Sequence, residues 1–262
     1  MVLWHCGVMV LRRYGFGIFC IYGILPKCHN ATTPILMTFA EKILDFHKNL
    51  QPNWKLPKGV ELLFPFHNED TWHVMTAFYQ KYFNDERERI LIFGINPGRF
   101  GAGVTGTPFT DPKILEEVCN IPNPFPKRYE LSAIFVYEYI AAYGKPETFY
   151  QDFYITSLCP LGFVKDGKNY NYYDDKVLEK AVEPHIIYNI EQNIQFGCSS
   201  KVALCMGQGK NYKYFEKLNE QQGFFEEIIP LPHPRWVMQY RRKRKEEFIE
   251  LFTKTLKEVK KR

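Results

Sequence analysis

The sequence of 262 residues lacks the features that mark several common classes of protein. Its seven cysteines include no Cys-x-x-Cys pair, which argues against a zinc site and against a clustered iron–sulfur site. Buried free thiols in a reducing cytosol are expected instead, with no metal. The apolar stretch Tyr14–Leu25 has only twelve residues, which is too short to span a bilayer, so no membrane association is expected.

The chain also has no visible internal repeat, and its length fits one α/β domain better than two. Its net charge is only +5, but this charge is unevenly placed. Residues 241–262 contain ten lysines and arginines against four glutamates, so the rest of the chain is close to neutral. A basic end on a near-neutral body is typical of a protein that binds a polyanion.

The N-terminal segment 1–36 differs in character from the rest of the chain. Two arginines precede its apolar stretch, as in a signal peptide, but no small-x-small cleavage site comes after it. We consider a mis-assigned start codon, a disordered tail and a weak export signal, and we favour the first. Met37 precedes a helix start, in which Thr38 and Glu41 have the spacing of a capping box. The folded domain is therefore expected to cover 37–262.

The most informative stretch of the chain is 89–109, which begins with the apolar run Ile90–Phe93. Such a run, bounded by glycine and proline, predicts a strand buried on both faces. Pro97 fixes its own φ angle and keeps Asn96 out of the helical region, so Asn96 is held at the carboxyl end of the strand. Open α/β sheets place ligand-contacting residues at that edge, and the nearby glycines let a ligand approach the backbone.

Periodicity and turn signals predict the other elements. Helices are expected over 38–50, 70–83, 131–143, 174–196, 210–220 and from about 242, with a further start at Asp111-Pro112. Strands are expected over 153–158, 202–206 and 225–231. Pro184 is expected to kink or break the longest helix. This alternation predicts a single three-layer α/β domain, in which helices flank a central four-stranded, mostly parallel sheet.

Three of the predicted strands end in a polar residue within a turn rich in proline and glycine. These residues are Asn96, Ser157 and His233. Because the ends of parallel strands point the same way, an amide, a hydroxyl and an imidazole are expected together at one mouth of the sheet.

The pattern resembles the uracil-DNA glycosylase superfamily, and most closely its single-strand-selective monofunctional branch. The resemblance rests on Gly94-Ile-Asn-Pro-Gly-Arg-Phe-Gly101 running on to Thr105-Gly-Thr-Pro-Phe109. It is supported by Gly144-Lys-Pro-Glu-Thr-Phe149, by Ser157-Leu-Cys-Pro-Leu161 and by a terminal His-Pro motif followed by basic residues. In order and spacing it covers about residues 60–255. It implies a uracil-DNA glycosylase-like fold and a monofunctional, cofactor-free glycosylase of base-excision repair, which removes uracil or a related deaminated or oxidised base.

The resemblance also implies roles for individual residues. Asn96 would position the attacking water, and His233 would donate a hydrogen bond to the charge that develops on uracil O2. The base pocket would be formed by Ile95, Gly98, Phe109 and Ser157, with Phe109 stacked on the flipped base. The DNA-binding residues would be Arg99, Arg235, Trp236, Val237, Met238, Arg241, Arg242 and Lys243. Of these, residues 235–238 would fill the vacated space as a wedge.

The chain departs from the family pattern at three places. Arg99 stands where the family has proline, and Ser157 stands where it has asparagine. One hydroxyl cannot offer uracil a donor and an acceptor as completely as an amide does, so a broader base pocket is expected. The family's His-Pro-Ser-Pro-Arg here reads Leu231-Pro-His-Pro-Arg235. Alignment on Pro-Arg would put Leu231 at the catalytic position, whereas alignment on the histidine keeps the chemistry and is preferred.

Two other classes of protein fit parts of the sequence. Gly101–Gly106 matches the G-x-G-x-x-G pattern of dinucleotide-binding oxidoreductases, but it begins well after the strand and leads into a Pro-containing turn. A non-catalytic nucleic-acid-binding module would keep the basic helix and reduce Asn96 to a turn residue. No lysine stands in the three strand-end motifs as a Schiff-base nucleophile, so no lyase step is expected. We expect a cytoplasmic, monomeric enzyme that binds single- or double-stranded DNA carrying a damaged base.

Overall fold

The computed structural model describes residues 2–5, 8–11 and 37–262. The chain divides into two compact units, the first ending at Leu36 and the second beginning at Met37. Within the first unit, β1 (Val2–His5) pairs antiparallel with β2 (Val8–Leu11). The stretch Tyr14–Leu25 lies outside the described residues, so the interpretations of the N-terminal segment stay predictions.

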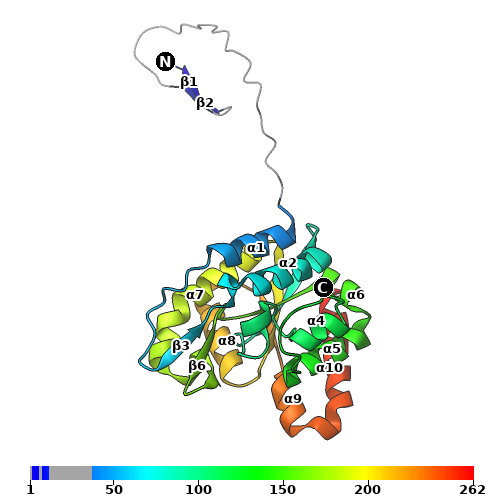
Figure 1. The fold of residues 1–262 in the computed structure, drawn as a ribbon. Coiled ribbons are helices and arrows are strands. Elements are labelled where there is room, and N and C mark those ends of the chain that lie inside the picture. Colours follow the sequence, from blue (N-terminus) through cyan, green and yellow to red (C-terminus); the bar gives the residue numbers. More distant parts are fainter. Residues whose placement is uncertain (1, 6–7, 12–36) are drawn as a thin grey trace, which may run out of the picture. The chain divides into compact units, whose positions relative to one another are not determined.

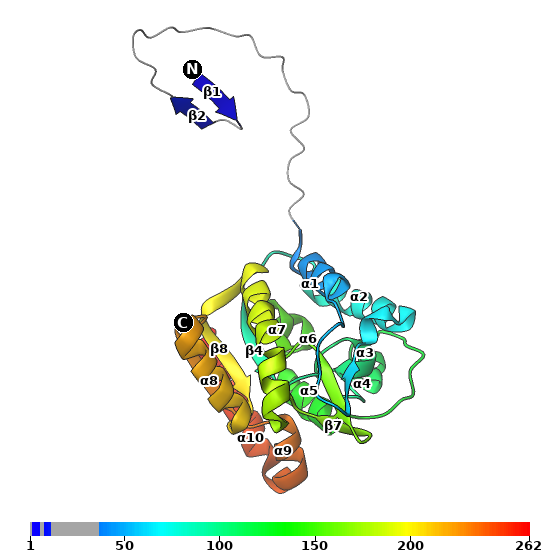
Figure 2. The same ribbon diagram turned by 90° about the vertical axis from the view of Figure 1, so that its left-hand side faces the viewer.

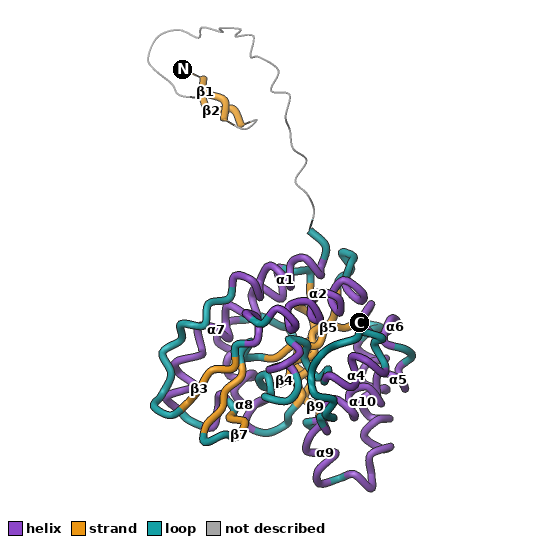
Figure 3. The backbone as a smooth tube through the Cα atoms, viewed as in Figure 1, coloured by secondary structure: helices purple, strands orange, loops and turns teal. Residues whose placement is uncertain are grey.

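The second unit is built around a four-stranded sheet, whose strands are drawn in orange in Figure 3. The strand order in this sheet is β5-β4-β8-β9. Its strands are β4 (Arg89–Gly94), β5 (Phe153–Ser157), β8 (Cys198–Met206) and β9 (Glu227–Leu231). Every pairing between them is parallel, which confirms the expected sheet. Gly94 lies opposite Ser157 and Met206 lies opposite Leu231, so the strands end together at one edge.

Helices cover both faces of this sheet (Figures 1 and 2). On one side lie α7 (Lys176–Gln195) and α8 (Lys210–Gln222), and on the other lie α5 (Leu131–Tyr143), α6 (Pro146–Asp152) and α10 (Lys245–Val259). Right-handed connections between parallel strands explain this division. The chain passes from β4 to β5 through α5 and α6, and it then crosses the sheet in the opposite direction, from β5 to β8, through α7. The two connections therefore place their helices on opposite faces of the sheet. The helices α1 (Phe39–Asn49) and α2 (Glu69–Phe83) pack together and contact β5 through Tyr154.

Local sequence signals account for several helix ends. Thr38 and Glu41 form the expected capping box, with 2.8 Å between the Thr38 backbone nitrogen and the Glu41 carboxylate. Asp111 caps α4 (Pro112–Glu117) by accepting hydrogen bonds from the backbone N–H groups of Lys113 and Ile114, as an N-cap aspartate does. These ends confirm the helix starts that the sequence predicts.

Two helical segments differ from the expectation. α7 continues unbroken through Pro184, because the helix has buried residues before and after the proline that hold it in the core. The final helix α10 begins at Lys245 and not near 242. A separate helix α9 (Pro234–Tyr240) and a 3-10 turn over Arg242–Arg244 precede it, and the periodicity did not predict either.

A second sheet, also not predicted from the periodicity, lies beside the first motif. Its antiparallel strands are β3 (Val60–Leu63), β6 (Gly162–Lys165) and β7 (Lys168–Tyr170). The β6–β7 turn residues Asp166 and Gly167 have φ angles of 50° and 70°, the left-handed pair typical of an Asp-Gly hairpin. β6 passes so close to the Asn-Pro-Gly turn that a Cβ on Gly162 would lie 2.2 Å from the Pro97 carbonyl oxygen.

The cysteines of the described residues fit the prediction of buried free thiols. Four cysteines of the second unit are free and buried, namely Cys119, Cys159, Cys198 and Cys205. This confirms the prediction of buried thiols for that part of the chain; Cys6, Cys20 and Cys28 lie outside the described residues. None of the described helices has the length and apolarity that crossing a membrane requires.

A buried arginine fixes the start of β4, the strand that leads into the first motif. The Arg89 side chain is fully buried, and its guanidinium pairs with both oxygens of Asp85 at 2.8 and 3.0 Å. Its Nε donates to the Tyr150 carbonyl at 2.7 Å. The guanidinium also lies 4.7 Å from the Phe39 ring centroid and 4.8 Å from that of Phe83. Two further bonds, to the carbonyls of Arg87 and Tyr82, give every guanidinium donor a partner, as a buried charge requires.

We expect Asp85→Asn to lower the free energy of unfolding by about 3 kcal/mol, because it leaves the Arg89 charge buried without its counter-ion. Urea denaturation measures this change. Asp45→Asn, at an exposed position on α1, is the matched control and should leave the midpoint unchanged. Equal midpoints for the two variants would contradict the structural role of the Arg89 pair.

Candidate active site

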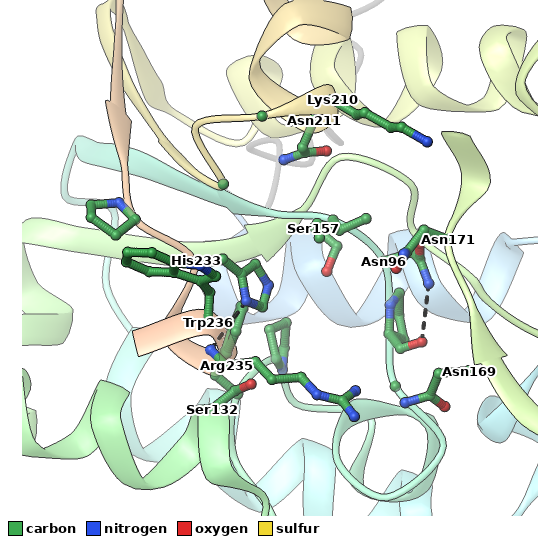
Figure 4. A pocket seen from close by; sticks show the side chains of 18 of the residues that line it. Asn96, Ser132, Ser157, Asn169, Asn171, Lys210, Asn211, His233, Arg235 and Trp236 are labelled. Atoms are coloured by element: carbon green, nitrogen blue, oxygen red, sulfur yellow. Dashed lines mark hydrogen bonds between the residues drawn. The ribbon is translucent and has the colours of Figure 1, made fainter. Parts of the chain in front are cut away.

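The carboxyl edge of the main sheet opens into a pocket of about 530 Å³ (Figure 4). The ends of β4, β5 and β9 each contribute one of the expected polar residues to its wall. These are Asn96, Ser157 and His233. In Figure 4, His233 and Asn96 lie on opposite sides of the pocket, with Ser157 between them. The sequence therefore predicted correctly that the three strand ends meet.

The carboxamide of Asn96 is oriented by the backbone at the end of β7 and just after it. Its Nδ2 donates to the Tyr170 carbonyl at 3.2 Å, and its Oδ1 accepts from the Tyr172 backbone N–H at 3.2 Å. Because one partner only accepts and the other only donates, the amide has a single satisfactory orientation. Its oxygen keeps a second lone pair, which is available to hold a water or a ligand hydroxyl.

The imidazole of His233 is neutral and has one defined tautomer. His233 is the N-cap of α9, and its Nδ1 accepts a hydrogen bond from the Arg235 backbone N–H at 3.1 Å. Nδ1 is therefore unprotonated, so Nε2 carries the ring proton and can donate it to a ligand. Burial, and then the charge of Arg235, lower the pKa of His233 to about 4. The ring thus remains a neutral donor throughout the physiological pH range.

Phe109 lines the pocket in a constrained backbone conformation. Its φ of 53° is in the left-handed region, which is uncommon for a bulky residue. Its ring lies over the end of β4, where a Cβ on Gly94 would be 2.7 Å from the ring. The ring centroid is 6.2 Å from that of His233. Phe109 is therefore a flat apolar wall of the pocket, close to the imidazole.

Ser157, Ile95 and Gly98 complete the expected base pocket, and all of them line it. Ser157 is largely buried, and its carbonyl accepts from the Asn189 side chain at 2.9 Å. No hydrogen bond of the Ser157 hydroxyl is found among the described residues, so that group can rotate toward a ligand. The pocket consequently combines an amide, a hydroxyl, an imidazole donor and an aromatic wall.

Comparison with known proteins agrees with this geometry. The model of the uracil DNA glycosylase superfamily matches residues 80–257. The chain belongs to the uracil-DNA glycosylase superfamily. It is also similar to SMUG2 from Pedobacter heparinus, whose crystal structure it matches at 45% sequence identity and a TM-score of 0.84. That match covers 87% of this chain and 100% of the other.

The backbone at Gly101–Gly106 argues against the dinucleotide-binding interpretation of this stretch. In the structure, this stretch forms only the short helix α3 (Ala102–Thr105), which ends at Gly106 with a φ of 69°. No long helix opens there, so the glycines do not present a helix N-terminus to a pyrophosphate.

The rim of the pocket carries basic and aromatic residues. Arg235 extends across the pocket toward Asn169, and Trp236 stands beside His233 (Figure 4). The Arg99 guanidinium lies 4.4 Å from the ring centroid of the exposed Phe100 and donates to the Gly167 carbonyl. Arg99 is therefore engaged with the β6–β7 hairpin at the edge of the pocket.

The expected wedge is smaller than the sequence suggested. Residues 235–238 form the start of helix α9, so successive side chains point in different directions. Val237 is 0% exposed and Met238 is 5% exposed, and both belong to the hydrophobic core. The prediction that Val237 and Met238 belong to a DNA wedge is therefore wrong. Trp236 and Tyr240 are the exposed aromatic residues of this helix.

The expected basic cluster follows α9 directly. The Arg241 guanidinium lies 4.9 Å from the Trp236 ring centroid. Arg242 and Lys243 are exposed on the 3-10 turn that leads to α10. These cations are therefore next to the aromatic rim of the pocket.

The register of the last motif is clear in the geometry. Leu231 is buried at the end of β9 opposite Met206, whereas His233 lies two residues further on and lines the pocket. The structure thus favours the alignment on the histidine over the alignment that places Leu231 at the catalytic position.

Several pocket residues were missed by the sequence analysis. They are chiefly Glu130, Ser132, Asn169, Asn171, Tyr173 and Lys210. The Asp-Gly pair at 166–167, which is a strong hairpin signal, would have predicted β6 and β7 and so brought Asn169 and Asn171 near the site. Among the described residues, no group of three or more His, Cys, Asp or Glu side chains is arranged to hold a metal ion.

We expect nitrogen-15 NMR of the His233 side chain to show an unprotonated Nδ1 and a protonated Nε2 at neutral pH. Its titration midpoint should lie at about 4, because burial disfavours the imidazolium. An imidazolium at position 233 at neutral pH would contradict this picture.

Proposed function

We propose that this protein is a monofunctional DNA glycosylase that hydrolyses the N-glycosidic bond of uracil, or of a related deaminated or oxidised base, in DNA. Its role would be the first step of base-excision repair. The observation that carries the proposal is the placement of Asn96 and His233 on opposite sides of one pocket (Figure 4). The superfamily membership supports the same class of reaction.

The two residues fit the two halves of the reaction. Cleavage of the bond leaves positive charge on the sugar and negative charge on the base. Asn96, whose amide is fixed by Tyr170 and Tyr172, would hold the attacking water with its free lone pair. His233 would donate Nε2–H to the base oxygen as charge develops there. A neutral donor suits this role, since it needs no change of protonation at physiological pH.

The remaining walls would bind the base outside the helix stack. Phe109 would stack on the flipped base, and the backbone at Ile95 and Gly98 would line its edges. Ser157 would contact the pairing edge with a hydroxyl that can both donate and accept. We infer a pocket that accepts deaminated purines as well as uracil, because a rotating hydroxyl leaves fewer mismatched polar groups than a fixed amide.

The rim would position the DNA. Arg99, Arg235, Arg241, Arg242 and Lys243 are proposed to contact phosphates, which act mainly on affinity and little on base choice. Trp236, together with the exposed Tyr240, would replace the flipped base in the stack. We also propose that the enzyme is cytoplasmic and monomeric, and that it needs no cofactor.

We expect Asn96→Ala to lower the single-turnover rate on a uracil-containing oligonucleotide by about 10²-fold or more, because it removes the contact that positions the water. Alkali treatment of the product reveals the abasic sites. DNA affinity should change little, because no phosphate contact is removed.

Asn49→Ala, at an exposed position on α1 far along the chain from the motifs, is the matched control and should cleave like the wild type. Thermal unfolding checks that Asn96→Ala remains folded. A folded Asn96→Ala that cleaves within a few-fold of the wild type would show that this residue has no catalytic role.

A further inference from the structure

The pocket also contains a carboxyl group, which takes no part in the roles proposed for Asn96 and His233. Glu130 is the N-cap of α5, but its side chain does not cap the helix. Its backbone N–H instead donates to Asp111 at 2.7 Å, which fixes the position of the residue. The side chain is thereby free to project into the pocket, whose wall it forms together with Asn96 and His233.

The carboxylate lies against the glycine loop that follows Asn96. A Cβ on Gly98 would be 3.3 Å from Glu130 Oε1, and a Cβ on Gly101 would be 2.1 Å from Oε2. The absence of side chains at these glycines therefore makes room for this acid. Gly98 is only two residues beyond Asn96, so the acid and the amide flank the same turn.

This carboxylate has no ion pair and no hydrogen bond within the described part of the chain. The charged groups that act on it are Asp111, at the start of α4, and Arg235, on α9. Burial of an acid without a direct partner costs free energy of folding. A negative charge in a DNA-binding site also repels the phosphates. A carboxylate with these costs is a candidate for a functional group that acts on the bound substrate.

The proposed reaction has a step that Asn96 and His233 leave unassigned. Water that attacks the sugar must lose a proton, and a carboxamide is not a base at neutral pH. His233 cannot take this proton, because its Nδ1 is already occupied by the Arg235 backbone N–H and its Nε2 is protonated. A carboxylate on the wall that adjoins Asn96 is the appropriate acceptor.

We propose that Glu130 is a further catalytic residue and acts as the general base for the water that Asn96 holds; this inference rests on the proposed glycosylase function. The water oxygen forms a bond to C1′ of the sugar, and the bond from C1′ to the base nitrogen breaks. The bonding electron pair leaves with the base as an anion, which His233 stabilises. The water proton moves to the Glu130 carboxylate and is then released to solvent.

The environment of Glu130 suits this role. Burial, and then the charge of Asp111, raise the pKa of Glu130 to about 7, whereas Arg235 opposes the rise. A base is most effective when its pKa is near the working pH. Because the base form is the ionised one, activity should increase as the pH rises through about 7 and level off above it. The pKa of His233, at about 4, keeps that residue from contributing to this change.

The test is the pH dependence of single-turnover cleavage of a uracil oligonucleotide at subsaturating enzyme, where the rate reports groups of the free enzyme. For the wild type we expect a rise through about pH 7, as the Glu130 carboxyl ionises. Glu130→Gln should cleave about 10²- to 10³-fold more slowly at high pH and should lose the rise. Its DNA affinity should be equal or higher, since a negative charge is removed.

Glu220→Gln, exposed on α8, is the isosteric control and should keep both the rate and the pH profile of the wild type. Glu130→Asp retains a carboxylate and should recover part of the rate together with the pH dependence. If Glu130→Gln is poorly folded, the Glu130→Asp profile decides, because a merely structural role would leave no pH-dependent step in it.

Two results separate failure of this inference from failure of the proposed function. A wild type that cleaves uracil DNA and a Glu130→Gln variant that matches it within three-fold, with the same pH profile, would overturn the role of Glu130 alone. A wild type that makes no abasic sites with any of the tested bases would overturn the glycosylase function, and the role of Glu130 with it.

Discussion

The candidate site depends on the pair of hydrogen bonds that join Asn96 to the backbone at Tyr170 and Tyr172. They connect the end of the main parallel sheet to the small antiparallel sheet. A free asparagine at a strand end would rotate, and its oxygen would have no fixed direction. The β6–β7 hairpin removes that freedom, and Gly162 lets the hairpin pass close enough to do so. Preorganisation of this kind is what water positioning requires.

The parallel sheet supplies the second constraint. Because β4, β5, β8 and β9 are parallel and in register, their carboxyl ends share one edge. Asn96, Ser157 and His233 are distant in sequence but meet at that edge, because each lies within two residues of the end of its strand. Asp111 adds a link between layers, since it caps α4 and also binds the Glu130 backbone N–H. Helix starts and pocket residues are thus fixed by the same side chain.

Much of this could be predicted from the sequence, where the signal is local. The apolar run before Gly94, the capping box at Thr38 and the helix over 131–143 all depend on neighbouring residues, and the structure contains them. Strand-end residues could be grouped because parallel topology brings such ends together. The family resemblance implied a wedge that includes Val237 and Met238, but helix α9 turns both side chains into the core, and only the three-dimensional packing shows this. Glu130 could not be predicted as a site residue, because its proximity to Gly98 and Gly101 is a tertiary contact with no sequence signature.

We propose that the chain releases a damaged base by hydrolysis, without cutting the strand. The most direct measurement is incubation of excess wild-type protein with a single-stranded oligonucleotide that contains one uracil. Mass spectrometry then quantifies the free base and the remaining strand. The account predicts stoichiometric free uracil and an abasic strand that stays intact until alkali is added. An oligonucleotide that is bound but keeps its uracil would contradict the account and favour a non-catalytic DNA-binding protein.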